Sequence, residues 1–322
     1  MKRDLRIVFM GTPEFAIPSL DAIIKAKYNV VGVVTAPDKP SGRGQKVSIS
    51  AVKEYSISKG LNILQPEKLR NQDFLNELNK LNANLYIVIA FRMLPKVVWS
   101  LPKYGTFNLH ASLLPQYRGA APINHAIING EPFTGVTTFF INDRIDTGSI
   151  IMQEKTSISE NDTAGTLHDR LMDIGSNLVI KTIKAIEANE YILSDQEELS
   201  SQLEIKHAPK IYKTDCKIDW SMNVEHIHNF IRGLSPYPAA FSELHISKDK
   251  TLQAKFYKTH YLKCEHENQI GAIETDNKET ITIWAKNGKI IVDEIQISGK
   301  KRLRTTDFLN GFTFDDNYYF QK

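Results

Sequence analysis

Short apolar runs that alternate with helical patterns dominate the first half of the chain. Ile7–Met10, Val30–Val34 and Leu85–Phe91 are continuous apolar runs bounded by turn residues, whereas Asp73–Leu81 repeats its apolar side chains with a helical period. Uninterrupted apolar strands between helices are typical of a sheet that is buried on both faces. We therefore expect an α/β domain with a mostly parallel sheet and flanking helices.

The pattern continues through the middle of the chain and then changes. We expect strands over Phe107–Leu114, Gly135–Ile141 and Ile150–Ile158, and the longest helix over Thr163–Ala188. From about Lys210 onward the apolar runs become short and β-branched, and turn residues separate them, which favours a small sandwich or barrel. The prediction is therefore two domains, residues 1–206 and 207–322.

Composition agrees with two domains and narrows the cellular setting. A chain of 322 residues, 42% of them hydrophobic, exceeds one typical core. The two cysteines, Cys216 and Cys264, are too few for a disulfide framework and lack metal-ligand spacing, so we expect reduced thiols and no metal. No apolar run approaches the ~18–20 residues of a membrane span, and Ile7–Met10 is too short for a signal peptide. We expect a cytoplasmic protein without a membrane partner.

The charge balance gives little support for nucleic-acid binding by the chain as a whole. The formal net charge is +3, and residues 207–322 hold 17 Lys and Arg against 15 Asp and Glu. Any RNA binding must therefore depend on local basic patches.

Two polar side chains interrupt the strand expected at Phe107–Leu114. Asn108 and His110 alternate with apolar neighbours, and the period of two puts both on one side near the carboxyl end of the strand. Ligands of open α/β sheets bind at that end, where an amide donor and an acid/base can meet a reacting carbonyl. The alternative is a core histidine with a hydrogen-bonded amide beside it, and these two residues alone do not exclude it.

A carboxylate follows the next predicted strand. Asp146 stands before Thr147 and Gly148 in the loop after Gly135–Ile141. A carboxylate beside an imidazole raises its proton affinity and orients the ring. The same residue in this context also suits a turn or a helix cap.

Longer motifs carry a resemblance to a known family. The run NLHASLLPQYRGAAPINHAIINGE from Asn108, followed by TGVTTFF and IDTG, resembles the signature of the folate-dependent formyltransferases. The resemblance implies a Rossmann-like catalytic domain, an OB-like second domain, 10-formyltetrahydrofolate as co-substrate and no metal. It also implies that Asn108, His110 and Asp146 are catalytic. The residues that it places at the folate pocket are Ser112, Leu113, Leu114, Pro115, Ala90, Phe91 and Leu94.

Three further segments resemble the members of this family that formylate methionyl-tRNA. They are the loop Thr35–Lys46, the stretch Ala208–Ile211 with Ile218–Trp220, and Ile231–Ala240. The resemblance implies that the chain transfers the formyl group to the amino group of initiator methionyl-tRNA. It predicts tRNA contacts at Lys39, Arg43, Lys46, Lys210 and Arg304. Nothing in the sequence demands an oligomer, and we expect a monomer.

Several alternatives remain at this point. A formyltransferase that acts on a sugar-nucleotide amine keeps Asn108, His110 and Asp146 but does not need the Thr35–Lys46 loop or an RNA-binding barrel. A formyltetrahydrofolate hydrolase uses the same site with water as acceptor. A non-catalytic RNA-binding protein requires the three residues to be incidental. One departure from the family concerns the folate pocket, because Arg92 stands where the family usually has glycine.

Overall fold

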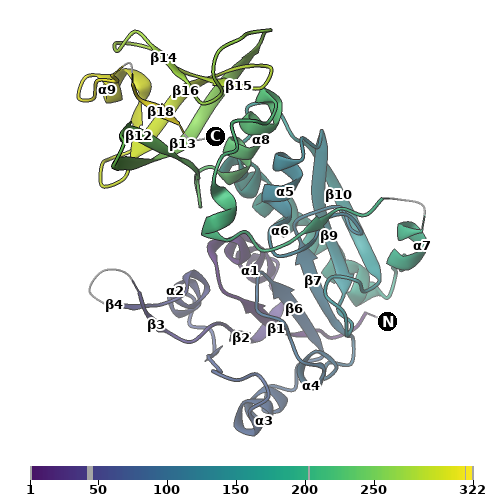
Figure 1. The fold of residues 1–322 in the computed structure, drawn as a ribbon. Helices are drawn as coiled ribbons and strands as arrows, with labels where there is room; N and C mark the ends of the chain where they lie inside the picture. Colours follow the sequence, from purple (N-terminus) through teal and green to yellow (C-terminus); the bar gives the residue numbers. More distant parts are fainter. Residues whose placement is uncertain (1, 42–45, 202–203, 316, 321–322) are drawn as a thin grey trace. The chain divides into compact units, whose positions relative to one another are not determined.

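The computed structural model describes residues 2–41, 46–201, 204–315 and 317–320 (Figure 1). The chain divides into two compact units that are interleaved in sequence. The first unit takes residues 1–119, 134–157 and 168–207, and the second takes residues 120–133, 158–167 and 208–322. Two short segments of the predicted first domain therefore belong to the second unit. The predicted boundary between residues 206 and 207 stays a prediction about domain organisation.

A seven-stranded sheet forms the centre of the first unit, with the order β10-β9-β7-β6-β1-β2-β5. β1, β2, β5, β6 and β7 pair in parallel, and β9 pairs with β7 in antiparallel orientation. The bounds are β1 (Arg6–Gly11), β2 (Asn29–Val34), β5 (Ile63–Leu64), β6 (Leu85–Ile89), β7 (Thr106–His110), β9 (Phe133–Phe140) and β10 (Ile150–Ser157).

Helices cover both faces of this sheet. One face packs Val8 and Val88 against the apolar side of α3, including Phe74 and Leu78. On the other face, Gly175 of α6 approaches Leu109 of β7 so closely that an added Cβ would lie 2.7 Å from the leucine side chain. Since side chains alternate along β7, Asn108 projects to the same face as its neighbour Val88, away from Leu109 and α6.

The remaining elements around this sheet are short, apart from α6. The helical elements are η1 (Glu14–Ala16), α1 (Ile17–Lys25), α2 (Ala51–Ser58), α3 (Gln72–Lys80), α4 (Lys96–Trp99), α6 (Ala164–Ala188) and α7 (Gln196–Ser200). The short strands are β3 (Lys39–Ser41), β4 (Lys46–Ser48), β8 (Arg118–Gly119) and β11 (His207–Ala208). β3 and β4 pair in antiparallel register, with Lys39 opposite Ser48.

The strand predicted over Phe107–Leu114 is wrong in its second half. β7 ends at His110, and residues 111–114 lie in a turn region. The reason is that the Thr137 hydroxyl takes the place of ladder partners: it donates to the Ser112 carbonyl at 2.6 Å and accepts from the Leu114 amide at 3.1 Å. The apolar character of this turn comes from burial, not from strand pairing.

The second unit contains an antiparallel barrel that is nearly closed. Its strands follow the order β14-β15-β16-β13-β12-β18, and β17 pairs with β16. A bridge between Ala272 and Tyr319 joins the two ends of this order. The bounds are β12 (Ala240–Ser247), β13 (Lys250–Lys263), β14 (Ile273–Thr275), β15 (Ile281–Ala285), β16 (Gly288–Ile297), β17 (Leu303–Arg304) and β18 (Tyr319–Phe320). The helical elements are α5 (Pro122–Ile128), η2 (Lys213–Cys216), α8 (Val224–Leu234) and α9 (Thr305–Leu309).

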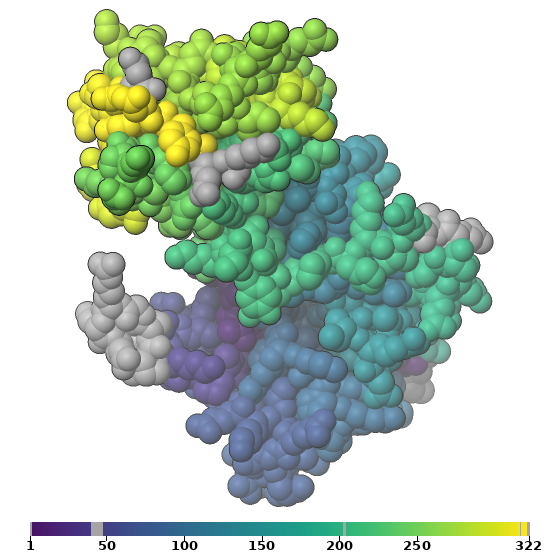
Figure 2. All heavy atoms as spheres, viewed as in Figure 1, coloured from purple at the N-terminus to yellow at the C-terminus, as the bar shows by residue number. Residues whose placement is uncertain are grey.

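Aromatic packing fills the barrel. Trp220 is fully buried, packs against Phe256 and Phe320, and donates its indole N–H to the Ser242 hydroxyl at 3.0 Å. In the space-filling view, the described atoms of this barrel form a continuous outer surface (Figure 2). The predicted α/β sheet followed by a small barrel is therefore confirmed. Among the described helices, none is long and apolar enough to cross a membrane.

Candidate active site

The carboxyl ends of three parallel strands meet at one edge of the first unit's sheet. β1, β6 and β7 are neighbours, and Gly11, Ile89 and Leu109 lie at the same level of the register. His110 follows Leu109, and Ala90 follows Ile89, so the two lie beside each other at this edge. This is the position at which open α/β sheets bind their ligands.

His110 is held by a backbone carbonyl and faces Asp146. Its side chain is nearly buried, and its Nε2 lies 2.8 Å from the Tyr117 carbonyl oxygen. Because a carbonyl only accepts, Nε2 carries a proton in either charge state of the ring. Nδ1 then faces Asp146 Oδ2 at 3.8 Å, a distance that allows an ion pair when the ring is protonated. Nδ1 is therefore the ring nitrogen that faces Asp146.

The loop that carries Asp146 is folded back by special backbone geometry. β9 runs antiparallel to β7, so its end at Phe140 lies opposite Phe107, at the far end of β7 from His110. Asp146 nevertheless reaches His110 with a φ of +53°, a left-handed conformation that aspartate tolerates better than most residues. A Cβ at Gly148 would lie 1.6 Å from the Phe140 carbonyl oxygen, so only glycine fits there. Asp146 Oδ2 also accepts from the Gly119 amide at 3.0 Å.

A buried amide ties this loop to the loop after β7. Gln196, at the start of α7, is fully buried and donates to the Gly148 carbonyl at 2.7 Å. Its Oε1 accepts from Arg118 Nε and Nη2 at 3.0 and 2.8 Å. Burial, followed by the positive charge of Arg144, lowers the pKa of Arg118, which remains cationic. Sequence reasoning missed both residues, since Gln196 lies in a polar segment without a clear period.

Asn108 differs from its neighbours because its side chain is free. It is half-buried, and its amide forms no hydrogen bond with any residue in the described part of the chain. Its position on the same face of β7 as His110 follows from the alternation. A preset, unoccupied amide donor beside an imidazole is the arrangement that stabilises a developing oxyanion. The alternative of a hydrogen-bonded structural amide does not hold for Asn108 among these residues.

The residues predicted for the folate pocket fall into two groups. Leu94, Ser112, Leu114 and Pro115 are buried, and Leu94 belongs to the core formed with α3. Residues 90, 91 and 113 keep exposed surface, and Ala90 has a φ of +47° where β6 ends. Ser112 Oγ donates to the Gln116 carbonyl at 2.6 Å and so shapes the turn. Their contact with folate stays a prediction.

Arg92 takes a structural position at the same sheet edge. Its guanidinium donates to the Glu67 carbonyl at 2.7 Å and to the Pro66 carbonyl, and it lies over the Phe91 ring. Burial lowers its pKa. The arginine that departs from the family pattern therefore binds a neighbouring loop.

The predicted tRNA contacts lie on several elements. Lys39 is exposed and begins β3, Lys46 begins β4, and Arg43 lies outside the described residues. Lys210 lines a pocket in the second unit, and Arg304 is exposed at the end of β17. The structure brings Asn108, His110 and Asp146 to one edge, whereas the roles of these five cations stay predictions.

Comparison with known proteins identifies relatives of this chain. Residues 5–183 match the family described as formyl transferase, and residues 210–313 match its C-terminal domain. A methionyl-tRNA formyltransferase of Flavobacterium johnsoniae is 55% identical over 97% of this chain and 98% of its own length. One of Parabacteroides distasonis is 52% identical over 97% of each chain.

Solved structures show the same fold. An N-formyltransferase from Helicobacter canadensis, crystallised with folinic acid and dTDP-3-aminofucose, is 25% identical with a TM-score of 0.62. The alignment covers 89% of this chain and 98% of that one. With two family matches and relatives above 50% identity over nearly its whole length, the chain belongs to the formyl transferase family.

Proposed function

We propose that this chain transfers the formyl group of 10-formyltetrahydrofolate to the amino group of initiator methionyl-tRNA. The observation that carries the chemistry is the free Asn108 amide on the same strand face as His110, with Asp146 3.8 Å from the ring. The acceptor is supported by relatives named methionyl-tRNA formyltransferase at 52–55% identity. The structurally similar sugar formyltransferase is less similar, at 25% identity.

In the proposed mechanism, Asn108 and His110 act on the formyl oxygen. The amine nitrogen bonds to the formyl carbon, and the carbonyl electron pair moves to oxygen. The Asn108 amide and the Nδ1–H of protonated His110 donate to this oxyanion. The Nε2–H group cannot donate to the oxyanion, because it already donates to the Tyr117 carbonyl. Two donors from one rigid strand need little rearrangement as the charge develops.

Asp146 completes the proposed mechanism in two ways. Its carboxylate lies 3.8 Å from Nδ1 of His110 and orients the ring, and the Gly119 amide holds one of its oxygens. It also receives the proton that the attacking amine gives up, directly or through water. When the adduct collapses, the bond from carbon to folate N10 breaks and N10 takes that proton. Charge and protons balance without a covalent enzyme intermediate.

The remaining assignments belong to the same proposal. Folate lies against Ala90, Phe91, Leu94 and the turn from Ser112 to Pro115. Lys39, Arg43, Lys46, Lys210 and Arg304 contact tRNA. The protein acts as a cytoplasmic monomer, and the reaction needs no metal. Relatives that carry a translation enzyme's name support the setting.

One assay tests the function directly. The full-length protein is incubated with 10-formyltetrahydrofolate and methionyl-initiator tRNA, and an acid-urea gel separates formylated from free aminoacyl-tRNA. The expected result is complete, enzyme-dependent formylation. Transfer to an amino-sugar nucleotide but not to tRNA, or release of formate without transfer, would overturn the proposal in favour of one of the alternative activities.

A further inference from the structure

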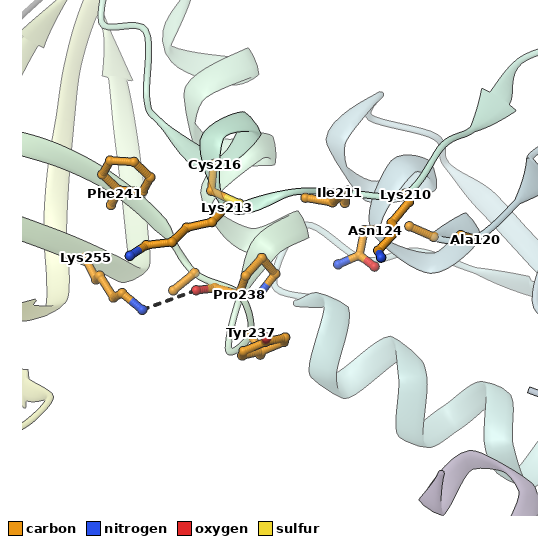
Figure 3. Close-up of a pocket in the computed structure, with 12 residues that line it drawn as sticks. Ala120, Asn124, Lys210, Ile211, Lys213, Cys216, Tyr237, Pro238, Phe241 and Lys255 are labelled. Carbon is orange, nitrogen blue, oxygen red and sulfur yellow. Dashed lines mark hydrogen bonds between the residues drawn. The ribbon is translucent and has the colours of Figure 1, made fainter. Parts of the chain in front are cut away.

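The second unit holds a pocket that the proposed chemistry does not use. It has a volume of about 350 Å³ and is formed by residues of this unit alone (Figure 3). The residues that line it include three lysines, Lys210, Lys213 and Lys255, together with Tyr237 and Asn124. In Figure 3, Lys213 and Lys255 lie at one end beneath Phe241, and Lys210 and Asn124 lie at the other.

Firm backbone contacts build this pocket. Asn124 of α5 donates to the Gly233 carbonyl near the end of α8 at 2.7 Å, which fixes the two helices together. The chain then turns through residues 235–238, and the Ala239 amide donates back to the Leu234 carbonyl at 2.9 Å. This turn leaves Tyr237 83% exposed at the pocket. Lys255 extends from β13 opposite Phe241 of β12.

Some cations of this unit are paired with a carboxylate, whereas the three pocket lysines are not. Lys217, Lys263, Lys289 and Arg302 each pair with a glutamate. In contrast, Lys210, Lys213 and Lys255 form no ion pair with any residue that the structure describes. The Lys255 ammonium donates weakly to the Pro238 carbonyl at 3.4 Å, and the Lys210 ammonium lies 5.2 Å from the centroid of the Tyr212 ring.

No carboxylate in the described part of the chain forms an ion pair with these ammonium ions. The Asp215 carboxylate accepts hydrogen bonds from the Tyr212 amide at 2.8 Å and the Thr214 hydroxyl at 3.3 Å. Burial, and then Asp215, raise the pKa of the Cys216 thiol although Lys255 opposes them, so this thiol stays neutral. Three like charges around one hollow repel one another, and an anion that binds between them relieves that repulsion.

The size and lining of the pocket narrow the class of anion. A volume near 350 Å³ lies at the lower end of the ~300–1,000 Å³ typical of small-ligand sites, so it suits one nucleotide and not a duplex. Ammonium groups suit phosphate oxygens, and exposed aromatic rings stack on bases that are not paired. An acidic peptide shares the charge but gives no reason for an exposed Tyr237 ring.

We infer that this pocket binds one unpaired nucleotide of an RNA, with its phosphate at Lys213 and Lys255 and its base against Tyr237. The inference rests on the proposed function for the identity of the RNA, the tRNA acceptor. It adds a defined subsite in the second unit, separate from the transfer chemistry at Asn108, His110 and Asp146. Lys210 and Asn124 contact the neighbouring nucleotide at the other end.

Binding measurements on the full-length protein test the inference without any formyl donor. Fluorescence anisotropy follows labelled, uncharged initiator tRNA at several salt concentrations. The variant is Lys213→Gln with Lys255→Gln, and its matched control is Lys217→Gln with Lys289→Gln, which removes the same charge from lysines paired to glutamate. The expected result is a Kd on the order of tenfold higher for the pocket variant alone, with a salt slope lower by about 0.7 per lost phosphate contact.

The aromatic contact has its own signature. Tyr237→Ala raises the Kd by on the order of tenfold and leaves the salt slope unchanged, because stacking releases no counterions. Tyr237→Phe restores binding, since the ring remains. Equal weakening by the pocket and control double variants would overturn the inference. The inference would also be overturned if a polyglutamate peptide protected the pocket lysines from lysine-selective modification while the RNA and AMP did not.

A competition arm separates RNA from a free ligand. AMP that displaces tRNA from the wild-type protein, with weaker effect on the Tyr237→Ala variant, supports the nucleotide subsite. AMP that binds the pocket without affecting tRNA overturns the RNA assignment in favour of a free nucleotide. Loss of transfer activity with intact, pocket-dependent RNA binding would count against the proposed function alone.

Discussion

The candidate active site and the second unit's pocket satisfy their polar groups in opposite ways. Around His110, the ring, the Asp146 carboxylate and the Gln196 amide all have partners within the first unit. In the pocket, three ammonium groups have no carboxylate partner among the described residues. Chemistry on one carbonyl requires fixed donors, whereas binding a flexible polyanion requires charge that is free to respond. Asn108 is the exception in the first region, and we propose that its amide donor is kept for the substrate.

The largest expected effect concerns the Asn108 amide, the free donor of the candidate active site. Asn108→Ala should lower kcat on the order of 10²–10³-fold, because one preset oxyanion donor is lost. The KM values for both substrates should change little, since the amide acts on the transition state. Initial rates of tRNA formylation measure the change. Asn76→Ala, an exposed asparagine on α3, serves as the control, and nearly unchanged turnover for Asn108→Ala would show that the amide is structural.

A second prediction separates positioning from contact with substrate. Gln196→Met should destabilise the fold by about 1–3 kcal/mol, because Arg118 and the Gly148 carbonyl lose buried partners. It should also lower kcat by about tenfold through displacement of Asp146, with a shift in the pH profile of kcat that a purely structural role would not give. Thermal unfolding and pH–rate profiles of the purified variant measure the two effects.

The matched control for this variant is Ser200→Ala. The Ser200 hydroxyl lies 3.5 Å from Arg118 Nη2, and among the described residues it forms no hydrogen bond with residues 142–148. A Gln196→Met protein with lower stability and an unchanged pH profile would mean that the bridge supports the fold alone.

The third prediction concerns Arg43, which lies between β3 and β4 in the sequence and outside the described residues. Arg43→Ala should raise the KM for methionyl-tRNA several-fold, because a phosphate contact is lost, while kcat and the KM for the formyl donor stay within twofold. Steady-state kinetics with each substrate varied in turn measure the split, and Lys68→Ala provides a charge-matched control. Equal effects on both substrates would mean that the loop acts on the active site as a whole.

The sequence predicted the placement of Asn108 and His110 on one strand better than it predicted the surroundings that hold them. Asn108 and His110 could be placed together because side-chain alternation along a strand follows directly from local pattern. Asp146 needed the family resemblance, since its loop reaches His110 only through the left-handed backbone at residue 146 and the close contact of Gly148 with Phe140. These are tertiary constraints with no period to detect.

Elements that depend on distant contacts were the ones that sequence reasoning missed. The strand predicted to Leu114 stops at His110 because one hydroxyl, Thr137, replaces its ladder partners. Gln196 and the pocket around Tyr237 escaped notice because each combines segments far apart in the chain. A single residue such as Gln196 or Tyr237 gives no signal in the sequence, and only the folded structure reveals what it contacts.

The smallest expected effect tests whether unpaired cations contribute more to tRNA binding than cations paired with a carboxylate. Arg302 and Arg304 lie two residues apart, but Arg302 pairs with Glu294 and Arg304 forms no ion pair with a described residue. Arg304→Ala should weaken tRNA binding about two- to threefold, and Arg302→Ala should weaken it less, because its charge is already compensated. Anisotropy titrations of the two variants at one low salt concentration measure the difference. If Arg302→Ala weakens binding as much as Arg304→Ala, then net charge, and not freedom from a partner, controls how the second unit attracts RNA.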